Sequence, residues 1–310
     1  MIEIDISSFI FDVDFVSSVT VSWHGFFSFV AVLTAVLLVG RWAPLYNLDP
    51  DDVLSVAVWA IIGGVIGARV VHVIDNWDAI YTANPARIFY IWQGGIAVWG
   101  AILGGFIGGS AYAFLAEWWE RRKHRDEESP ADGEAPRAKF PVGALADLTA
   151  PALLFVQSIG RVGDIINGEH CAKATEQFFG FQWVHPETAA RICANGVTNG
   201  AHPVIILEMA WNMVALAVIW QLRGRLKPAG MLFALYIALY SIGRFGVSFL
   251  REDRIWALGM QEAHYISLLM LVVTVPLLAI KARLTDRVED APAVFERGTR
   301  ADRRRRQRKA

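Results

Sequence analysis

The sequence predicts an all-α integral membrane protein with seven transmembrane helices. Hydrophobic residues make up 55% of the 310 residues and charged residues only 19%, and the mean hydropathy is +0.37. A soluble chain of this size carries more charge and interrupts its apolar stretches sooner. Apolar runs close to the roughly 20 residues that cross a bilayer recur along the chain, and basic residues gather in alternate connecting segments. Seven such runs do not fit inside one soluble core.

The predicted spans begin after a short acidic segment. Residues 1–22 contain acidic side chains and no basic one, so they do not resemble a secretory signal peptide, and we expect the first span to act as the insertion signal. The spans are expected at about 23–40, 53–74, 88–116, 140–160, 203–220, 229–250 and 265–280. Together with an external segment at 161–202, between spans four and five, they form one membrane domain over 1–280.

The distribution of Lys and Arg predicts that the N-terminus is outside and the C-terminus is cytoplasmic. Of the 29 basic residues, 21 lie in the segments that would then be cytoplasmic, namely 41–52, 117–139, 221–228 and 281–310. The segments on the other side carry far fewer, which is the positive-inside pattern. The remaining pair, Arg69 and Arg244, lies inside spans.

Two hydrophilic segments flank this domain on the cytoplasmic side. Residues 117–139 are polar, contain Pro and have mixed charge, which is typical of a solvated linker. The tail, 281–310, ends in RRRRQRK and is predicted to be a basic, disordered extension. We expect this tail to fix the orientation and to contact anionic membrane lipid rather than nucleic acid.

The third span is rich in glycine. Gly100, Gly104 and Gly108 repeat every four residues, which lets another helix backbone approach closely. QGGIAVWG at 93–100 indicates an irregular entry before the helix begins. Tight helix packing alone, or a wall of a wet cavity, would explain the pattern equally well.

Both cysteines, Cys171 and Cys193, fall in the external segment, where the environment is oxidising. A disulfide between them and a pair of free thiols are both compatible with two cysteines.

Three arginines lie at the external ends of spans two, four and six. These are Arg69, Arg161 and Arg244, and Arg251 follows the last of them by seven residues. Each could be an anchor that extends to the headgroup level. Together, and with Asp164, Glu169 and Glu208 near in sequence, they favour a cationic pocket for a phosphate-bearing group, because a guanidinium binds phosphate with two parallel hydrogen bonds.

The motifs around these arginines resemble those of the prolipoprotein diacylglyceryl transferase family. ADLTAPALLFVQSIGRVGDIINGEH at 146–170 is similar to the family pattern D-x-x-A-P…G-R-x-G-N-F-x-N-G-E. The order of further matches agrees along most of the chain: WHG at 23–25, GAR at 67–69, QGGIAVWGAILGG at 93–105, FGFQWVHPE at 179–187, HPVIILE at 202–208 and YSIGRFGVSFLRED at 240–253.

The resemblance implies a membrane-bound transferase in the bacterial cell (inner) membrane. Such enzymes move the diacylglyceryl group of phosphatidylglycerol onto the lipobox cysteine thiol of a preprolipoprotein, forming a thioether and releasing glycerol phosphate. It implies catalytic roles for Arg161, Arg244 and Glu169. The residues expected to bind phosphatidylglycerol are Arg161, Asp164, Asn167, Gly168, Glu208, Tyr240, Arg69, His24 and Trp99. No cofactor and no metal is expected, since the sequence has no metal-ligand spacing such as CxxC or HExxH.

The chain departs from the family pattern at several positions. Trp99 replaces a family histidine, Asp164 an asparagine and Ser248 a glutamate. Ala172 replaces a glycine, and His24 occupies the place of an opening tyrosine. Asp164 adds a negative charge that could pair with Arg161, and the general base is then left open between His24 and His170.

Two other functions stay open on the sequence alone. A membrane transporter would need polar groups across the whole bilayer, yet the ionisable residues lie on the outer side, with only Asp147 toward the inside. An inactive relative that binds lipid would be compatible with the substitutions at 99, 164 and 248.

Overall fold

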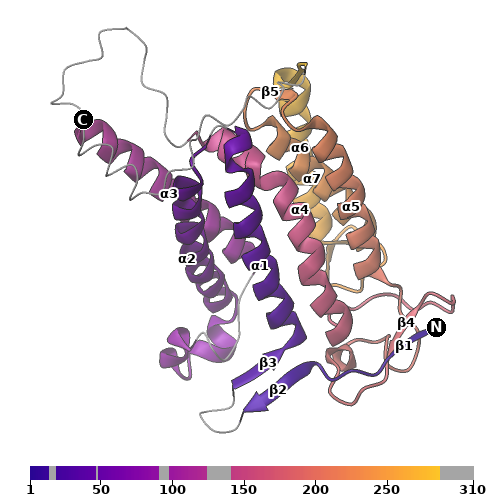
Figure 1. The fold of residues 1–310 in the computed structure, drawn as a ribbon. Helices are drawn as coiled ribbons and strands as arrows, with labels where there is room; N and C mark the ends of the chain where they lie inside the picture. The colour runs from indigo at the N-terminus through magenta and orange to yellow at the C-terminus, as the bar shows by residue number, and fades with distance from the viewer. Residues whose placement is uncertain (14–18, 47, 91–97, 124–140, 287–310) are drawn as a thin grey trace, which may run out of the picture. The chain divides into compact units, whose positions relative to one another are not determined.

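A computed structural model describes residues 1–13, 19–46, 48–90, 98–123 and 141–286 (Figure 1). Within these residues, seven helices are long and apolar enough to cross a membrane. They are α1 Trp23–Trp42, α2 Pro50–Asp75, α3 Val98–Lys123, α4 Val142–Asn167, α5 Val204–Leu222, α6 Met231–Ser248 and α7 Glu262–Lys281. The seven predicted spans are therefore confirmed as helices, and the orientation of the termini stays a prediction.

Three predicted boundaries are wrong. α3 does not stop at residue 116 but continues to Lys123, into the segment predicted as a linker. Residues 88–90 do not belong to the third helix, because Pro85–Phe89 form a 3-10 turn and α3 begins at Val98. The proposed irregular entry at 93–97 lies outside the described residues. The fourth helix does not stop at residue 160 but continues to Asn167. An ion pair between Arg161 and Asp164, one helical turn apart, offsets the charge that the sequence suggested would end the span.

The chain divides into two compact units. Unit 1 comprises Met1–Leu37 and Thr149–Leu284, and unit 2 comprises Leu38–Leu148 and Thr285–Ala310. The division falls inside α1 and inside α4. The described part of the predicted basic tail is only its first six residues, which include the short strand β8, Arg283–Leu284, paired with β5, Leu226–Lys227.

Unit 2 is built around α2 and α3, whose backbones touch through glycines. A methyl group at Gly104 would lie 2.2 Å from the carbonyl oxygen of Gly63, and one at Gly100 would lie 2.2 Å from that of Gly67. Gly108 meets the carbonyl of Trp59 at 2.5 Å in the same way. Only hydrogen fits at these distances, so the glycine repeat of α3 is used for direct helix packing. This supports the packing interpretation for residues 100–108.

Unit 1 contains α5, α6, α7 and most of α4. α6 packs against both α5 and α7. A fully buried cluster from α4, α5 and α6 includes Leu154, Ile219 and Leu232, and Gln157 donates a hydrogen bond to the Tyr236 hydroxyl at its edge. These apolar contacts set the spacing of the helices that carry the polar side chains described below.

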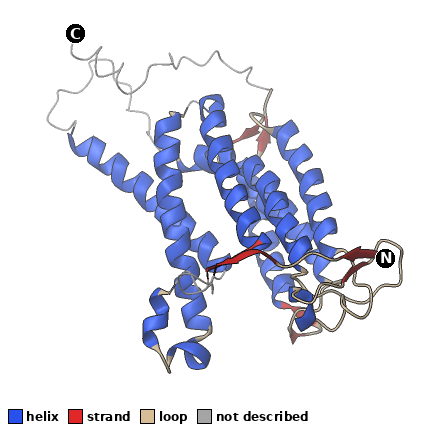
Figure 2. Cartoon of the chain, turned by 60° about the horizontal axis from the view of Figure 1, so that its bottom comes forward, coloured by secondary structure: helices blue, strands red, loops and turns tan. Residues whose placement is uncertain are grey.

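Short strands lie in the segments outside the helices (Figure 2). β1, Ile2–Ile4, pairs in parallel with β4, Phe181–Trp183, and β2, Phe9–Val13, pairs with β3, Val19–Ser22. β6, Ile255–Ala257, pairs with β7, Met260–Gln261. The all-α prediction is thus confirmed for the seven long helices, and the short ladders satisfy backbone groups in the segments that connect them.

Candidate functional site

Two arginines from different helices share one buried glutamate in unit 1. Glu208, in the second turn of α5, is only 8% exposed. Its Oε2 lies 2.7 Å from Nη2 of Arg161 on α4, and its Oε1 accepts a hydrogen bond from Nη1 of Arg244 on α6. Glu208 therefore fixes the separation of the two guanidinium groups, which the sequence predicted to act on the same ligand.

A third arginine, Arg251, lies beside this pair. Its Nη1 is 4.0 Å from Oε1 of Glu208 and, among the described residues, has no hydrogen-bond partner, although the side chain is almost fully buried. Its Nε and Nη2 donate to the carboxylate of Asp253 at 2.7 and 3.1 Å. We did not select Arg251 from the sequence. Arg251 follows Arg244 by seven residues, which is close to two helical turns, and this spacing indicates that both side chains lie on the same side.

Asp253 is held as a carboxylate by this contact. Burial alone would raise its pKa, but the hydrogen bond from Arg251 and the charge of that guanidinium outweigh burial, so the pKa lies below its ordinary value. Asp253 in turn orients Arg251 toward Glu208.

Asp164 is the second buried carboxylate of the site. Its Oδ2 accepts from Nη1 of Arg161 at 2.7 Å, which confirms the expected ion pair. Its Oδ1 lies 2.5 Å from Nδ1 of His24 on α1, and Oδ2 is also 3.1 Å from Nε2 of His170. One carboxylate thus joins an arginine and two histidines, and this network links α1 to the end of α4.

His24 reaches Asp164 because α1 crosses α4 at a glycine. A methyl group at Gly163 would lie 2.6 Å from Cα of His24 and 2.7 Å from the carbonyl oxygen of Trp23. The G of the R-x-G pattern is therefore needed for a close backbone approach. By contrast, a methyl at Gly160 would meet nothing nearer than 4.0 Å, at the side chain of Ala31.

The N-G-E residues form the turn that ends α4. Asn167 donates from Nδ2 to Oε1 of Glu169 at 2.8 Å, and its carbonyl accepts from the Thr188 hydroxyl. Gly168 has a φ of +73°, and a methyl there would lie 2.7 Å from the Thr188 hydroxyl oxygen, so both conformation and space require glycine. The turn directs Glu169 toward His24, whose Nδ1 is 3.5 Å from Oε2.

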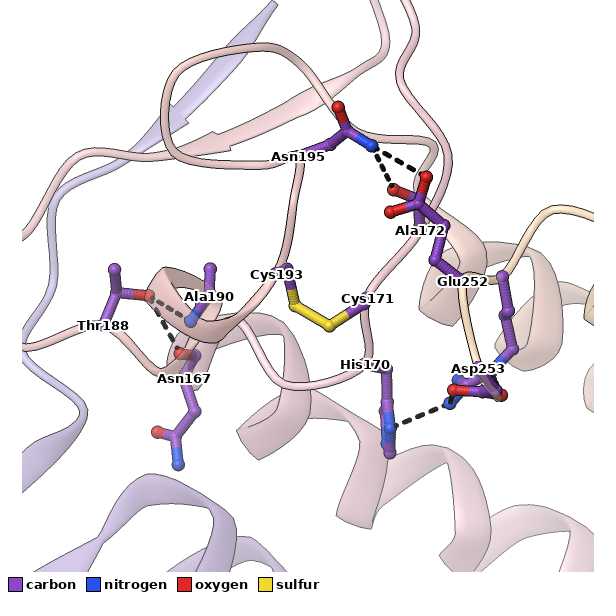
Figure 3. The surroundings of a disulfide bond; sticks show 11 residues. Asn167, His170, Cys171, Ala172, Thr188, Ala190, Cys193, Asn195, Glu252 and Asp253 are labelled. Carbon is purple, nitrogen blue, oxygen red and sulfur yellow. Dashed lines mark hydrogen bonds and ion pairs between the residues drawn. A yellow bond between two sulfur atoms is a disulfide. The ribbon is translucent and has the colours of Figure 1, made fainter. Parts of the chain in front are cut away.

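A disulfide holds the chain directly after this turn (Figure 3). Cys171 and Cys193 are bonded, which decides between the two alternatives left by the sequence. The bond ties the segment that carries His170 to the 3-10 turn Ala189–Ile192, which itself packs against Gly168. Nearby, Asn195 donates to Glu252 at 3.0 Å and so connects this segment to the loop that follows α6.

Tyr240 lies next to the arginine pair. A small pocket between α5 and α6 is lined by Tyr240, Arg244, Glu208 and Trp211 together with Asn212 and Gly243. The two helices approach closely there, since a methyl at Gly243 would overlap the Trp211 ring. The pocket therefore lies beside Arg244 and Glu208.

Two predicted ligands are not part of this cluster. Arg69 lies in unit 2, where its Nε donates to the carbonyl of Ile88 at 2.8 Å and its Nη2 to that of Arg87 at 2.5 Å. These bonds fold the segment after α2 onto that helix. Trp99 belongs to α3 in unit 2, and its side chain lies outside the described part of the chain. Lipid binding by Arg69 and Trp99 stays a prediction.

His24, Asp164 and Glu169 could together offer a cation three ligand atoms, all within 4.8 Å of one another. Asp164 is already engaged by Arg161 and two histidines, and the hydrogen bonds within the group account for its geometry. The expectation that the site uses no metal stays a prediction.

Comparison with known proteins agrees with the motifs. A model of the family described as prolipoprotein diacylglyceryl transferase matches residues 12–124 and 133–280. A phosphatidylglycerol–prolipoprotein diacylglyceryl transferase of Trichormus variabilis is 30% identical over 82% of this chain and 83% of its own length. Proteins of the same name from Listeria innocua and Dehalococcoides mccartyi are 31% and 30% identical, over 85% and 91% of this chain and 86% and 96% of their own lengths. Because the family model matches most of the chain and these relatives match over most of their own lengths, the chain belongs to the prolipoprotein diacylglyceryl transferase family.

Proposed function

We propose that this protein transfers the diacylglyceryl group of phosphatidylglycerol to the lipobox cysteine thiol of preprolipoproteins. The products are a thioether-linked diacylglyceryl cysteine and glycerol phosphate. The observation that carries the proposal is the pair of guanidinium groups on Glu208, with Nη1 of Arg251 beside them, which has no hydrogen-bond partner within the described residues. The full-length relatives, which are named for this reaction, support it.

The arginine arrangement suits a phosphate leaving group. Glu208 engages one nitrogen of each of Arg161 and Arg244, and a guanidinium has five N–H donors. Each arginine therefore keeps donors for phosphate oxygens while Glu208 holds it in place. When the glyceryl carbon–oxygen bond breaks, negative charge develops on the phosphate, and donors already aimed at it stabilise the transition state more than the ground state.

The arrangement also fits an external site. The polar residues come from the start of α1, the end of α4, the start of α5 and the end of α6. In a chain that crosses the membrane seven times, these helix ends all face the same side. We propose that this side is external, because 21 of the 29 Lys and Arg residues lie in the segments at the opposite helix ends. We also propose a bacterial inner-membrane location, with phosphatidylglycerol in the outer leaflet, because the relatives are bacterial.

The partners in this proposal are phosphatidylglycerol and a preprolipoprotein, with membrane lipid around the spans. We propose that the tail, 281–310, remains on the cytoplasmic side, where its basic residues contact anionic lipid rather than nucleic acid.

The direct test uses purified protein, labelled phosphatidylglycerol in vesicles and a lipobox peptide. The wild-type protein is expected to lipidate the peptide cysteine. Arg161→Ala and Arg244→Ala should each lower the rate about 10²–10³-fold, which is typical of losing one donor to a developing anion. Arg254→Ala removes an exposed arginine three residues after Arg251 and should leave the rate unchanged.

Absence of transfer by the wild-type protein, while a relative assayed in parallel is active, would reject the proposal in favour of a lipid-binding role.

A further inference from the structure

We infer that His24 is the general base that takes the proton from the attacking cysteine thiol, with Asp164 as the residue that positions it. This inference rests on the proposed function and adds the group that generates the nucleophile. Arg161 and Arg244 account for the leaving group, but nothing assigned to them removes the thiol proton. A thiol attacks as its thiolate, so a base within reach is required.

His24 has the geometry of a histidine oriented by a carboxylate. Its Nδ1 lies 2.5 Å from Oδ1 of Asp164, whose side chain is only 3% exposed. A buried carboxylate accepts but cannot donate, so Nδ1 carries the proton and the lone pair is on Nε2. The described part of the chain gives Nε2 no hydrogen-bond partner, and the His24 side chain is 41% exposed. Nε2 can therefore reach a substrate atom.

His170, the other histidine of the cluster, has no free nitrogen. Its Nε2 faces Nη1 of Arg161 at 2.7 Å and Oδ2 of Asp164 at 3.1 Å, while its Nδ1 faces Nη2 of Arg251 at 3.2 Å. Both ring nitrogens therefore face groups of the site itself, and His170 lies between Arg161 and Arg251.

Glu169 is a weaker candidate for the base. Its Oε1 already accepts a hydrogen bond from Asn167. A carboxylate has an ordinary pKa of about 4.3 and an imidazole about 6.5, against about 8.5 for a thiol, so proton transfer to imidazole is less uphill. Glu169 instead lies 3.5 Å from Nδ1 of His24, where its charge favours the imidazolium that forms.

In the resulting step, the S–H proton passes to Nε2 of His24 as the sulfur attacks the glyceryl carbon. A carbon–sulfur bond forms, and the bond between that carbon and the phosphate oxygen breaks. The bonding electron pair leaves with the phosphate, which gains one negative charge beside Arg161 and Arg244. The proton on His24 can then pass to solvent or to the departing glycerol phosphate.

The test is the pH dependence of transfer by His24→Gln in vesicles containing phosphatidylglycerol. Glutamine can still donate to Asp164 but cannot take up a proton. We expect a loss of about 10²–10⁴-fold at pH 7, the usual contribution of a general base. The loss should shrink about tenfold per pH unit toward pH 8.5, where the peptide thiol ionises by itself.

The charged groups around the imidazole, Asp164, Glu169 and Arg161, remain in this variant. His185→Gln is the matched control, because that ring accepts a hydrogen bond from the backbone of its own loop at Glu187, and it should behave as wild type.

Two further variants test the assignment independently of the pH profile. His24→Ala should regain activity with added imidazole, which a purely structural role would not allow. Asp164→Asn should lower kcat, because the imidazole loses its orientation, and the loss should shrink toward pH 8.5 as for His24→Gln.

Three outcomes would overturn the inference: His24→Gln within threefold of wild type at pH 7, a loss equal at all pH values, or no rescue of His24→Ala by imidazole. If the wild-type protein transfers lipid and one of these results is found, the role of His24 is rejected and the proposed function stands. If the wild-type protein does not transfer lipid, the proposed function itself is rejected.

Discussion

The α2–α3 pair and the α4–α5–α6 cluster show two ways of joining helices in one membrane protein. In the first, glycines let two helix backbones come into contact, as at Gly104 and Gly63. The buried Arg69 donates hydrogen bonds to backbone carbonyls there. In the second, carboxylates stand between helices, and Glu208 bridges α4 and α6 from α5. The first arrangement leaves little room for a ligand, and the second leaves cationic donors beside a pocket.

The two regions differ in whether the partners of their arginines are backbone or side-chain groups, and this decides which arginines are available to a ligand. The carbonyl partners of Arg69 are fixed parts of the backbone, so their release would require the segment around 85–90 to unfold. The carboxylate partners of Arg161 and Arg244 are side chains, and the guanidinium groups are partly exposed. A phosphate can add to such a site without disrupting a helix.

The largest effect is expected from breaking the carboxylate bridge. Glu208→Gln removes the charge that compensates Arg161 and Arg244, and loss of one partner from a buried charge cluster costs about 3–5 kcal/mol of stability. Transfer should fall as well, because the two guanidinium groups then repel each other. The unfolding temperature in detergent and the transfer rate measure both effects.

Glu176→Gln changes the net charge equally at an exposed position and should be neutral. Equal stability of the two variants would mean that the bridge is not what holds α4 and α6.

The second-largest effect is expected from removing the disulfide in the same region. Replacing Cys171 and Cys193 together by Ser opens a loop of about 22 residues and should cost about 3 kcal/mol. Because His170 directly precedes Cys171, the transfer rate should fall too. Thermal unfolding with and without reductant provides the measurement.

Reductant should lower the unfolding temperature of wild-type protein but not that of the double variant. If full reduction leaves the unfolding temperature of the wild-type protein unchanged, this prediction is wrong.

A smaller effect is expected from the α2–α3 pair. Gly104→Ala places a methyl group 2.2 Å from the carbonyl oxygen of Gly63, which no rotamer change relieves, and overpacking of this kind costs about 1–3 kcal/mol. At Gly105 the nearest atom, the carbonyl oxygen of Ala60, is 3.2 Å away, so Gly105→Ala should cost less. Denaturant unfolding in detergent ranks the two variants. If they lose equal stability, the close approach at Gly104 is not what limits the pair.

The smallest effect concerns Asp253. Its pKa is lowered in the folded protein by Arg251, so its carboxylate stabilises the folded state above the ordinary pKa of about 3.9. That contribution is lost as the pH falls through the lowered folded value. Because the side chain is 36% exposed, we expect less than about 1 kcal/mol.

Asp253→Asn should therefore flatten the dependence of the unfolding temperature on pH below about 4. Asp286→Asn, at an exposed position, serves as the control with the same charge change. A profile of Asp253→Asn that coincides with wild type would refute the assignment.

Most of the fold could be predicted from the sequence because span length and apolar content are local properties. The errors fall where local signals compete. Arg161 and Asp164 suggested the end of a span, but they neutralise each other one turn apart and α4 continues. The site was predicted in part: the arginines and Glu208 were found through motifs, while Arg251, just past the end of α6, was not selected.

By itself, the sequence determined the seven apolar helices, the glycine repeat of α3 and the family, since each is encoded in residue type and spacing. Only the tertiary structure decided that Cys171 bonds Cys193, that Glu208 joins two arginines, and that His24, unlike His170, has a ring nitrogen without a hydrogen-bond partner in the described part of the chain. The physical reason is distance along the chain: His24 and Asp164 are separated by 140 residues, and their contact exists because α1 crosses α4 at Gly163.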